Sequence, residues 1–502
     1  FVAQVLINKV KSKCCGIKVY NYLSRPRRFG KSLLIDTLQC YFEGKKELFD
    51  GLKIMELEEE WTEYPVIRLD MSGAGATADE IKDYLNLEFS KYEALYSIKP
   101  KETSRESVRF QVILDTAYQK TGKQVVVLID EYDSPLQHSW KTPEHEGCTE
   151  VYRSVFSVLK LKGNVLRFVF ITGITKFTQI SLFSVLNHLT NISFLPQFAP
   201  LCGITEEEMT VNFAPELEAL ADKMECSIEE AHDKLKTYYD GYHFSDENMT
   251  DIYNPFSLLN ALSQLRLRNY WISSGATSML NKFVNNMELR LHDFEDCYID
   301  KDTLETSDVI EGGSELFLYQ TGYLTIKGFD EDGYSLGFPN EEVRKALYKA
   351  VLPALTQKDI TDIVSIQSRL MHSMNNGNLE EAKQCMKSLI SNVPYSNKNL
   401  VSMDMEERYR LIISTILNAI GCQVEVEHML STGRIDIVAS TSRFIYVMEL
   451  KLANNGGINA AEKQMIDNGY LKPFLADDRK VIGVAVELDD MGKGLIDWKE
   501  VK

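Results

Sequence analysis

The 502-residue sequence lacks the features that mark membrane-spanning, disulfide-bonded and zinc-binding proteins. No apolar run approaches the ~20 residues that are needed to cross a bilayer. The nine cysteines are scattered, and no CxxC pair occurs, which excludes the usual zinc spacings and a disulfide framework. Residues 1–13 carry three lysines and lack the layout of a signal peptide. We therefore expect a soluble, cytoplasmic protein with no membrane association.

Acidic residues outnumber basic ones, and the formal net charge is -18. A protein this acidic does not bind a phosphate backbone with its whole surface. The charge is uneven, because residues 1–31 contain eight Lys or Arg and no Asp or Glu. We favour a basic edge around a phosphate site, and a nucleic-acid patch is the alternative.

Apolar runs alternate with helical patterns over the first 200 residues. Residues 124–130 and 165–172 are continuous apolar runs, which is typical of strands buried on both faces of a parallel sheet. Residues 16–23 and 64–70 are further strand candidates. Helical patterns separate the strands, so the sequence predicts a doubly wound α/β domain. The predicted helices are 31–42, 77–96 and 107–120.

A phosphate-binding motif lies between the first strand and the first helix of this pattern. The segment 25–32 reads RPRRFGKS, and we place Arg28, Phe29, Gly30, Lys31 and Ser32 in a nucleotide-binding loop. A helix that begins at such a loop directs its amide groups at phosphates. Lys31 would contact the β- and γ-phosphates, and Ser32 would bind Mg²⁺. The match is partial, because the usual first glycine is replaced by arginine at position 25.

A carboxylate pair, Asp130 and Glu131, directly follows the apolar run 125–129. This placement puts Asp130 near Mg²⁺ and Glu131 near the attacking water of ATP hydrolysis. The alternative for this pair alone is a strand end with two solvated acids. Thr172 ends another predicted core strand, where it could contact the γ-phosphate or simply be a polar strand end. The two motifs together favour an ATP site.

The C-terminal region contains a second group of charged residues. Glu449 and Lys451 lie two apart on one predicted strand and therefore share a face. If residues 440–443 form a symmetrical hairpin turn, Asp436 lies opposite Val447 and shares that face. Paired acids can hold Mg²⁺, and a lysine can orient a water for attack on phosphorus. Alternating charge on a surface strand is the alternative.

Two helices flank these strands. Glu406, on the helix that precedes the strands, could add a further acid to the metal site. Gln464, on the following helix, could add a polar contact. The predicted order of elements from residue 405 is α-β-β-β-α-β.

Five segments together resemble one family in detail. They are 23–33 (LSRPRRFGKSL), 128–135 (LIDEYDSP), 170–177 (FITGITKF), 239–242 (YDGY) and 253–257 (YNPFS). The family comprises bacterial AAA-ATPase-like proteins that carry a C-terminal PD-(D/E)xK nuclease-like domain. Its members also lack the first glycine of the phosphate loop, so the arginine is expected.

This resemblance implies that Lys31 and Ser32 bind ATP and that Asp130 and Glu131 are the Mg²⁺-binding and catalytic acids. It likewise implies that Asp436, Glu449 and Lys451 are the signature residues of the nuclease-like domain, with Glu406 as the helix glutamate. Residues 1–18 depart from the family, because they do not match its segment before the phosphate loop. This departure indicates a truncated or altered N-terminus.

The expected fold class is α/β, with a P-loop NTPase sheet, a helical lid and a restriction-endonuclease-like domain. We expect a P-loop domain over 1–200, a helical lid over 201–300, a mixed α/β connecting region over 301–395 and the nuclease-like domain over 396–502. Tyr239, Tyr242, Tyr253 and Phe256 are expected to pack in the core of the lid, and a base-stacking platform is the alternative.

The sequence predicts an ATP- and Mg²⁺-dependent ATPase that controls a nuclease acting on DNA or RNA. The alternative is an ATP-driven switch or scaffold whose C-terminal domain binds nucleic acid or protein without cleaving. Arg153 and Arg167 are expected near the ATP site, and either could act as an arginine finger. Related ATPases commonly assemble into rings, and the sequence leaves the oligomeric state open.

Overall fold

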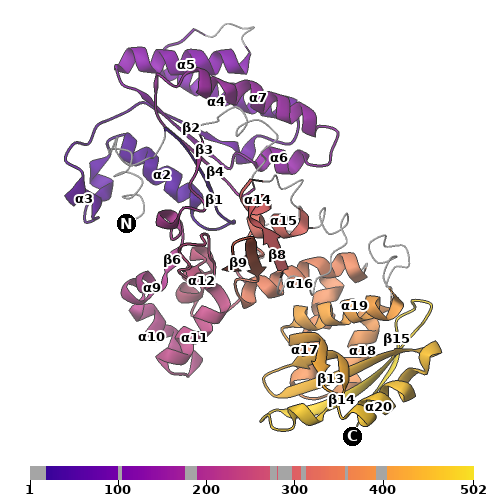
Figure 1. The fold of residues 1–502 in the computed structure, drawn as a ribbon. Helices are drawn as coiled ribbons and strands as arrows, with labels where there is room; N and C mark the ends of the chain where they lie inside the picture. Colours follow the sequence, from indigo (N-terminus) through magenta and orange to yellow (C-terminus); the bar gives the residue numbers. More distant parts are fainter. Residues whose placement is uncertain are drawn as a thin grey trace. The chain divides into compact units, whose positions relative to one another are not determined.

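A computed structural model describes residues 19–99, 105–175, 189–271, 280, 297–306, 313–356, 360–391 and 404–501. The chain forms two compact units, which are described separately (Figure 1). The first comprises Phe1–Arg268 and Asp296–Asn340, and the second comprises Asn269–Glu295 and Glu341–Lys502. Within the described ranges, no helix is both long enough and apolar enough to span a bilayer. The N-terminal departure expected at 1–18 lies outside them.

The first unit is built on a parallel five-stranded sheet with the order β2-β3-β4-β1-β5. The predicted runs of continuous apolar residues form its central strands, and every residue of β3 is buried. This confirms the parallel α/β sheet. The strands are β1 (Tyr20–Ser24), β2 (Val66–Asp70), β3 (Val125–Asp130), β4 (Leu166–Gly173) and β5 (Thr190–Asn191).

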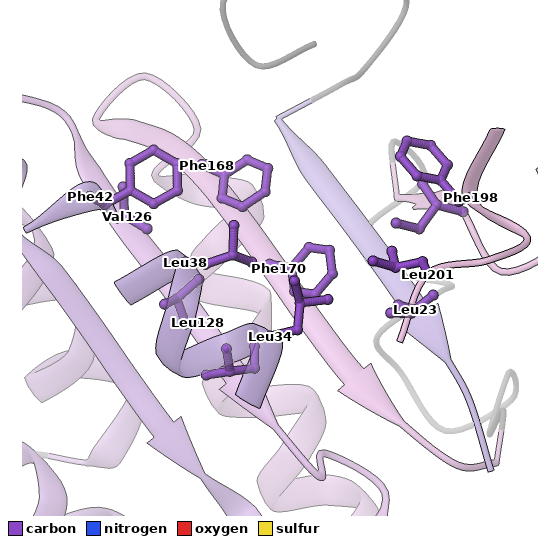
Figure 2. Close-up of a cluster of buried hydrophobic side chains, with 12 residues drawn as sticks. Leu23, Leu34, Leu38, Phe42, Val126, Leu128, Phe168, Phe170, Phe198 and Leu201 are labelled. Carbon is purple, nitrogen blue, oxygen red and sulfur yellow. The ribbon is translucent and has the colours of Figure 1, made fainter. Parts of the chain in front are cut away.

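Helices cover both faces of this sheet. Helix α2 (Lys31–Phe42) lies on one face, and α4 (Ala78–Leu95), α5 (Glu106–Thr121) and α7 (His145–Leu161) form a layer on the other (Figure 1). The short helices α3 (Ile54–Leu57) and α6 (Ser134–Ser139) complete this part. Figure 2 shows side chains of α2 facing those of β3 and β4 in one apolar core. Its labelled members are Leu23, Leu34, Leu38, Phe42, Val126, Leu128, Phe168, Phe170, Phe198 and Leu201.

The predicted helical stretch 205–239 is divided into three helices. A residue in the left-handed region, Glu225 (φ 54°), ends the second of them. Ser227 then caps the third by accepting a hydrogen bond from the Glu230 amide at 3.1 Å. The elements are β6 (Ile204–Thr205), α9 (Glu206–Asn212), α10 (Ala214–Met224), α11 (Ile228–Tyr239), β7 (Ile252–Tyr253) and α12 (Pro255–Gln264).

Residues 297–337 complete the first unit with an antiparallel sheet of order β8-β10-β9. A strand-like segment was expected near 318–338, and the structure has a helix up to Thr321 before the strands begin. The expected connecting region 301–395 is therefore shared between the two units, and the domain boundaries remain a proposal. The elements are β8 (Cys297–Asp300), α14 (Lys301–Thr306), α15 (Gly313–Thr321), β9 (Thr325–Phe329) and β10 (Gly333–Gly337).

The second unit places three helices, α16 (Glu341–Thr356), α17 (Ile360–Asn375) and α18 (Leu379–Ile390), before a mixed sheet. The predicted α-β-β-β-α-β order is confirmed, and one further strand follows it. The sheet order is β11-β12-β13-β14-β15, with only β13 and β14 parallel. The elements are α19 (Met405–Ile420), β11 (Gln423–Leu430), β12 (Gly433–Ser440), β13 (Phe444–Leu452), α20 (Gly457–Asn468), β14 (Lys480–Leu488) and β15 (Leu495–Val501).

The expected pairing of Asp436 with Val447 is wrong. Strands β12 and β13 pair Val438 with Val447, so the same register places Asp436 opposite Glu449. The turn is centred one residue later than expected, because the Thr441 amide and hydroxyl both bond to the backbone of Phe444. The partner of Asp436 shifts by two residues, from Val447 to Glu449, and an even shift leaves the side chains on their faces, so the expected shared face is retained.

Candidate functional site

The phosphate loop connects β1 to α2. Gly30 (φ 76°) caps the helix, and Arg28 (φ 70°) also lies in the left-handed region. Lys31 is buried, and its Nζ donates to the carbonyl oxygens of Arg25 and Pro26 at 3.0 and 3.1 Å. Burial lowers the pKa of Lys31, whereas the carboxylates of three acids, led by Glu131, oppose this shift. The loop thus holds its lysine at the N-terminus of α2, where a phosphate chain would bind.

Arg25, which replaces the usual glycine, is a buried structural residue. Its guanidinium is 1% exposed. It donates to the carbonyl oxygens of Phe198 at 2.7 Å, Ser193 at 3.0 Å and Leu201 at 3.1 Å. It also lies 4.1 Å from the centre of the Phe244 ring. Burial is the main cause that lowers the pKa of Arg25, to about 10. These hydrogen bonds therefore connect the phosphate loop to residues 193–201.

The next side chains of the loop pack against residues 242–256. Phe29 is fully buried, with its ring centre 4.9 Å from that of Tyr242 and 5.3 Å from that of Phe244. Its side chain is therefore part of the core, and only its backbone can face a nucleotide. Arg28 is exposed, and its guanidinium lies 4.5 Å from the centre of the Phe256 ring. Tyr239, Tyr242 and Tyr253 are fully buried, as expected for core residues, whereas Phe256 is only partly buried.

One carboxylate oxygen of Asp130 accepts hydrogen bonds, and the other accepts none from the described residues. Its Oδ1 accepts hydrogen bonds from the Thr172 hydroxyl at 2.5 Å and the Glu131 amide at 3.0 Å. Its Oδ2 is buried and has no hydrogen-bond partner among the described residues. A buried acceptor without a partner is unfavourable, and a cation would satisfy it. Ser32, the other predicted Mg²⁺ ligand, is exposed on the first turn of α2.

Glu131 is held in an unfavourable backbone conformation. Its φ is 45°, in the left-handed region that most residues avoid. Burial raises the pKa of its carboxyl group, and the nearby Lys31 opposes this shift. A strained, partly buried carboxylate beside a buried lysine fits the role of orienting a water.

Asp133, which sequence analysis did not single out, fixes the turn that carries Glu131. Its carboxylate accepts from the amide and the hydroxyl of Thr175 at 2.6 and 2.7 Å. A Cβ at Gly173 would lie 2.7 Å from both Tyr132 and Asp133, so the ends of β3 and β4 approach too closely for any side chain there. The sequence signal for this residue was a further acid three positions after Asp130.

The two arginine-finger candidates, Arg153 and Arg167, lie on different elements, α7 and β4. Arg167 is the second residue of β4, whereas Thr172 lies near the other end of that strand. Five strand residues separate them, or about 16 Å. The expectation that Arg167 lies near the ATP site is therefore wrong. Arg153 is exposed on α7.

The C-terminal unit brings the predicted nuclease residues together. Lys451 Nζ donates to Glu449 Oε1 at 2.9 Å and lies 3.6 Å from Glu406 Oε1. Glu449 is 1% exposed, and its Oε2 has no hydrogen-bond partner among the described residues. Asp436 Oδ2 accepts from the Leu450 amide at 2.8 Å, so this carboxylate replaces a backbone acceptor at the strand pair.

The electrostatics of this group follow from burial. Burial raises the pKa of Glu449, the neighbouring Asp436 adds to the rise, and Lys451 opposes it. Burial likewise raises the pKa of Glu406. For Lys451, burial opposes the charge, but the bond to Glu449 and the nearby acids raise its pKa overall. A divalent cation would remove the repulsion between the acids.

Sequence analysis missed two charged residues of this site, Arg410 and Glu427. Arg410, one helical turn after Glu406 on α19, lies 3.2 Å from Asp436 Oδ1 and 2.8 Å from Glu427 Oε1. The spacing of four residues from Glu406 was the available signal. Gln464, which was expected to add a polar contact, donates to the Tyr470 hydroxyl at 3.1 Å.

The carboxylates of the nucleotide site and of the C-terminal site each fit a divalent cation whose remaining ligands come from substrate and water. Among the described residues, no three His, Cys, Asp or Glu side chains form a preformed metal cluster. Mg²⁺ is usually bound through one or two carboxylates together with substrate phosphates and water. Asp130 with Ser32, and Asp436 with Glu449, are sets of this kind.

Comparisons with known proteins match the two regions of the chain that contain these groups. Residues 8–183 match the family model described as "Predicted AAA-ATPase", and residues 404–498 match that of the "PD-(D/E)XK nuclease superfamily". The chain is 29% identical over 492 residues to an Azotobacter chroococcum mcd 1 protein named "Uncharacterized protein in vnfD 5'region". That alignment covers 93% of this chain and 92% of the relative. The predicted resemblance is confirmed: residues 8–183 are similar to the AAA-ATPase-like family, and residues 404–498 are similar to the PD-(D/E)XK nuclease superfamily.

Proposed function

We propose that this protein binds and hydrolyses ATP with Mg²⁺ and that the nucleotide state controls a Mg²⁺-dependent nuclease site in its C-terminal unit. The observation that carries the proposal is shared by the two sites. Each contains a buried carboxylate, Asp130 or Glu449, with one bonded oxygen and one oxygen that has no hydrogen-bond partner in the described part of the chain. Each also contains a buried or half-buried lysine, Lys31 or Lys451.

In the ATPase site, the loop amides and Lys31 would bind the phosphates, and Asp130 with Ser32 would hold Mg²⁺. The metal would neutralise charge that develops on the γ-phosphate. Glu131 would accept a proton from the attacking water, and Thr172 would keep Asp130 in position through its hydroxyl. The backbone of Arg28, Phe29 and Gly30 would line the phosphate chain.

In the nuclease site, Asp436 and Glu449 would hold the cation, and Glu406 would bind it through water. The metal would act as a Lewis acid on a phosphodiester of DNA or RNA. Lys451, held by Glu449 at 2.9 Å, would orient the attacking water. The cytoplasmic location and any oligomeric assembly remain predictions from the sequence.

One observation favours the alternative of a non-cleaving switch. Arg410 contacts Asp436 Oδ1, one of the carboxylate oxygens that a metal would use. If this ion pair persists in the presence of Mg²⁺, the domain would bind nucleic acid or protein without cleaving it.

The test is a nuclease assay with single- and double-stranded DNA and RNA, with and without ATP and with Mg²⁺ or Mn²⁺. The Lys31→Ala variant should bind ATP more weakly and lose nucleotide control, and Glu449→Gln should lose cleavage while retaining ATP binding. Cleavage that is unaffected by Glu449→Gln would refute the nuclease assignment. ATP-dependent binding without turnover of any of the four substrates would favour the switch.

A further inference from the structure

Three acids lie in a row across neighbouring strands of the C-terminal sheet. The β11–β12 register pairs Val426 with Ile437 and His428 with Ile435, which places Glu427 opposite Asp436. The β12–β13 register in turn places Asp436 opposite Glu449. Like charges directly opposite each other on neighbouring strands are destabilising unless a cation separates them.

A guanidinium separates the first two acids of this row. Arg410 Nη2 lies 2.8 Å from Glu427 Oε1, and its Nη1 lies 3.2 Å from Asp436 Oδ1. The Arg410 and Asp436 side chains are 13% and 8% exposed, so this ion pair is largely shielded from solvent, whereas the Glu427 side chain is 38% exposed. Glu427 has φ 57°, a conformation that is unfavourable for this residue type and that interrupts the strand pairing. The half-exposed Arg434 also lies 3.1 Å from Glu427 Oε1.

Among the residues that the structure describes, no cationic side chain forms an ion pair with both Asp436 and Glu449. Lys451 binds Glu449 Oε1, and Glu449 Oε2 is buried without a partner among the described residues. The row therefore offers two positions for positive charge. The position between Glu427 and Asp436 holds Arg410, whereas within the described ranges no side chain bridges Asp436 and Glu449.

We propose that Arg410 takes the place of a second metal ion, so that the nuclease site uses one divalent cation and one fixed guanidinium to bind the substrate phosphate. This inference rests on the proposed nuclease function. Enzymes that cleave phosphodiesters often place two cations on either side of the reacting phosphate. A planar guanidinium can hold two carboxylates and still donate to a phosphate oxygen through its remaining N–H groups.

The proposal predicts how many metal ions the site binds. Removal of the guanidinium leaves Asp436 without this ion pair and leaves Glu427 with the half-exposed Arg434, so the first position becomes a second cation site. Mn²⁺ titrations, followed by calorimetry and electron paramagnetic resonance, should count one ion per nuclease site in the intact chain and two in Arg410→Gln. Every protein in this experiment carries Asp130→Asn, so that the nucleotide site contributes no metal.

Two further variants serve as controls. Arg410→Lys keeps one positive charge at the site and should bind a single Mn²⁺ even if its folding is mildly affected. Adding Glu427→Gln to Arg410→Gln should return the count from two to one. A count of two with Arg410 in place, or of one in a folded Arg410→Gln protein, overturns the proposal.

Substrate binding gives an independent readout. With Ca²⁺ in place of Mg²⁺, oligonucleotide binding by Arg410→Gln should weaken about tenfold, and its salt dependence should lose about one phosphate contact. An unchanged salt dependence counts against the proposal. If Asp436→Asn does not weaken Mn²⁺ binding at all, the metal site itself fails and the proposed function falls with this inference.

Discussion

The guanidinium of Arg25 donates to the carbonyl oxygen of Phe198 over 2.7 Å, across 173 residues of sequence. Arg25 belongs to the phosphate loop, and Phe198 lies beyond the last strand of the parallel sheet. Further carbonyl oxygens, those of Ser24, Ser193, Ala199 and Leu201, accept from the same guanidinium. The loop conformation is therefore supported by a side chain at the position where most phosphate loops have none.

Replacing Arg25 by glycine should destabilise the protein, although it restores the common phosphate-loop pattern. The change leaves several buried carbonyl oxygens without a donor, and each such loss costs about 1–3 kcal/mol. We expect a lower melting temperature for the first unit and weaker ATP binding, measured by calorimetry. Arg27→Gly, which alters a half-buried arginine of the same loop, is the control and should change stability much less. A fully stable Arg25→Gly protein would contradict this account.

Thr172→Val should weaken the binding of Mg²⁺-ATP about tenfold or more while leaving metal-free nucleotide binding unchanged. Valine keeps the shape of threonine but cannot donate to Asp130 Oδ1, so the carboxylate loses a fixed orientation. Titrations of ATP with Mg²⁺ and with EDTA measure the two affinities. Thr172→Ser retains the hydroxyl and should behave like the unaltered protein. Equal losses in both titrations would instead support the predicted direct contact between Thr172 and the γ-phosphate.

Asp436→Asn and Asp436→Ala should differ in stability although both lose metal binding. Asp436 Oδ2 accepts the Leu450 amide at 2.8 Å, and an asparagine carbonyl can replace that acceptor. Alanine leaves the buried amide without a partner, which should cost about 1–3 kcal/mol of unfolding free energy. Urea unfolding of the two variants measures the difference. Equal stabilities would show that this hydrogen bond is unimportant, and Asn is in any case the better variant for activity tests.

Asp240 should make the stability of the first unit depend on pH. It is 1% exposed, and neither carboxylate oxygen has a partner in hydrogen-bond geometry among the described residues. Burial raises its pKa from 3.8 to about 7; Asp251 and Glu206 add to the rise, and the Gly241 amide and Lys236 oppose it. Because the folded pKa lies above the unfolded one, folding takes up a proton, and stability falls as the pH rises from about 4 through 7.

Asp240→Asn removes this titration. The variant should therefore gain stability over the unaltered protein at pH 8, by at most about 4 kcal/mol, and lose most of this advantage by about pH 4. Thermal melts at the two pH values measure the effect. Asp251→Asn, at an acid that is more exposed, is a control and should give a smaller pH dependence. A stability difference that is the same at both pH values would contradict the assigned burial effect.

The sequence predicted the elements that apolar runs and motifs define. β3 and β4 are continuous apolar runs, and their parallel pairing follows from the intervening helices. The C-terminal order of elements was predicted for the same reason. The three-way division of 205–239 was missed, because one break lies at Phe213, just before the first turn of α10, and the other is a backbone reversal at Glu225 that no glycine marks.

Within the sites, the residues that were predicted are those that short motifs place together. The missed residues Asp133, Arg410 and Glu427 act through contacts between elements far apart in the sequence. Spacing along one strand or helix carries no information about such contacts. The role of Arg25 is another example, since the sequence shows the substitution but not the carbonyl oxygens that surround the guanidinium.

The strand order of the parallel sheet has a consequence for synthesis on the ribosome. β1 is one of the first elements of the chain, yet its partners in the sheet are β4 and β5. The nascent phosphate loop therefore has no sheet to join until residues 166–191 have left the exit tunnel. At about 5–20 residues per second, this delay lasts on the order of ten seconds or more. During that time the apolar β1 segment lacks its partner strands β4 and β5, and we expect it to be a binding site for a chaperone.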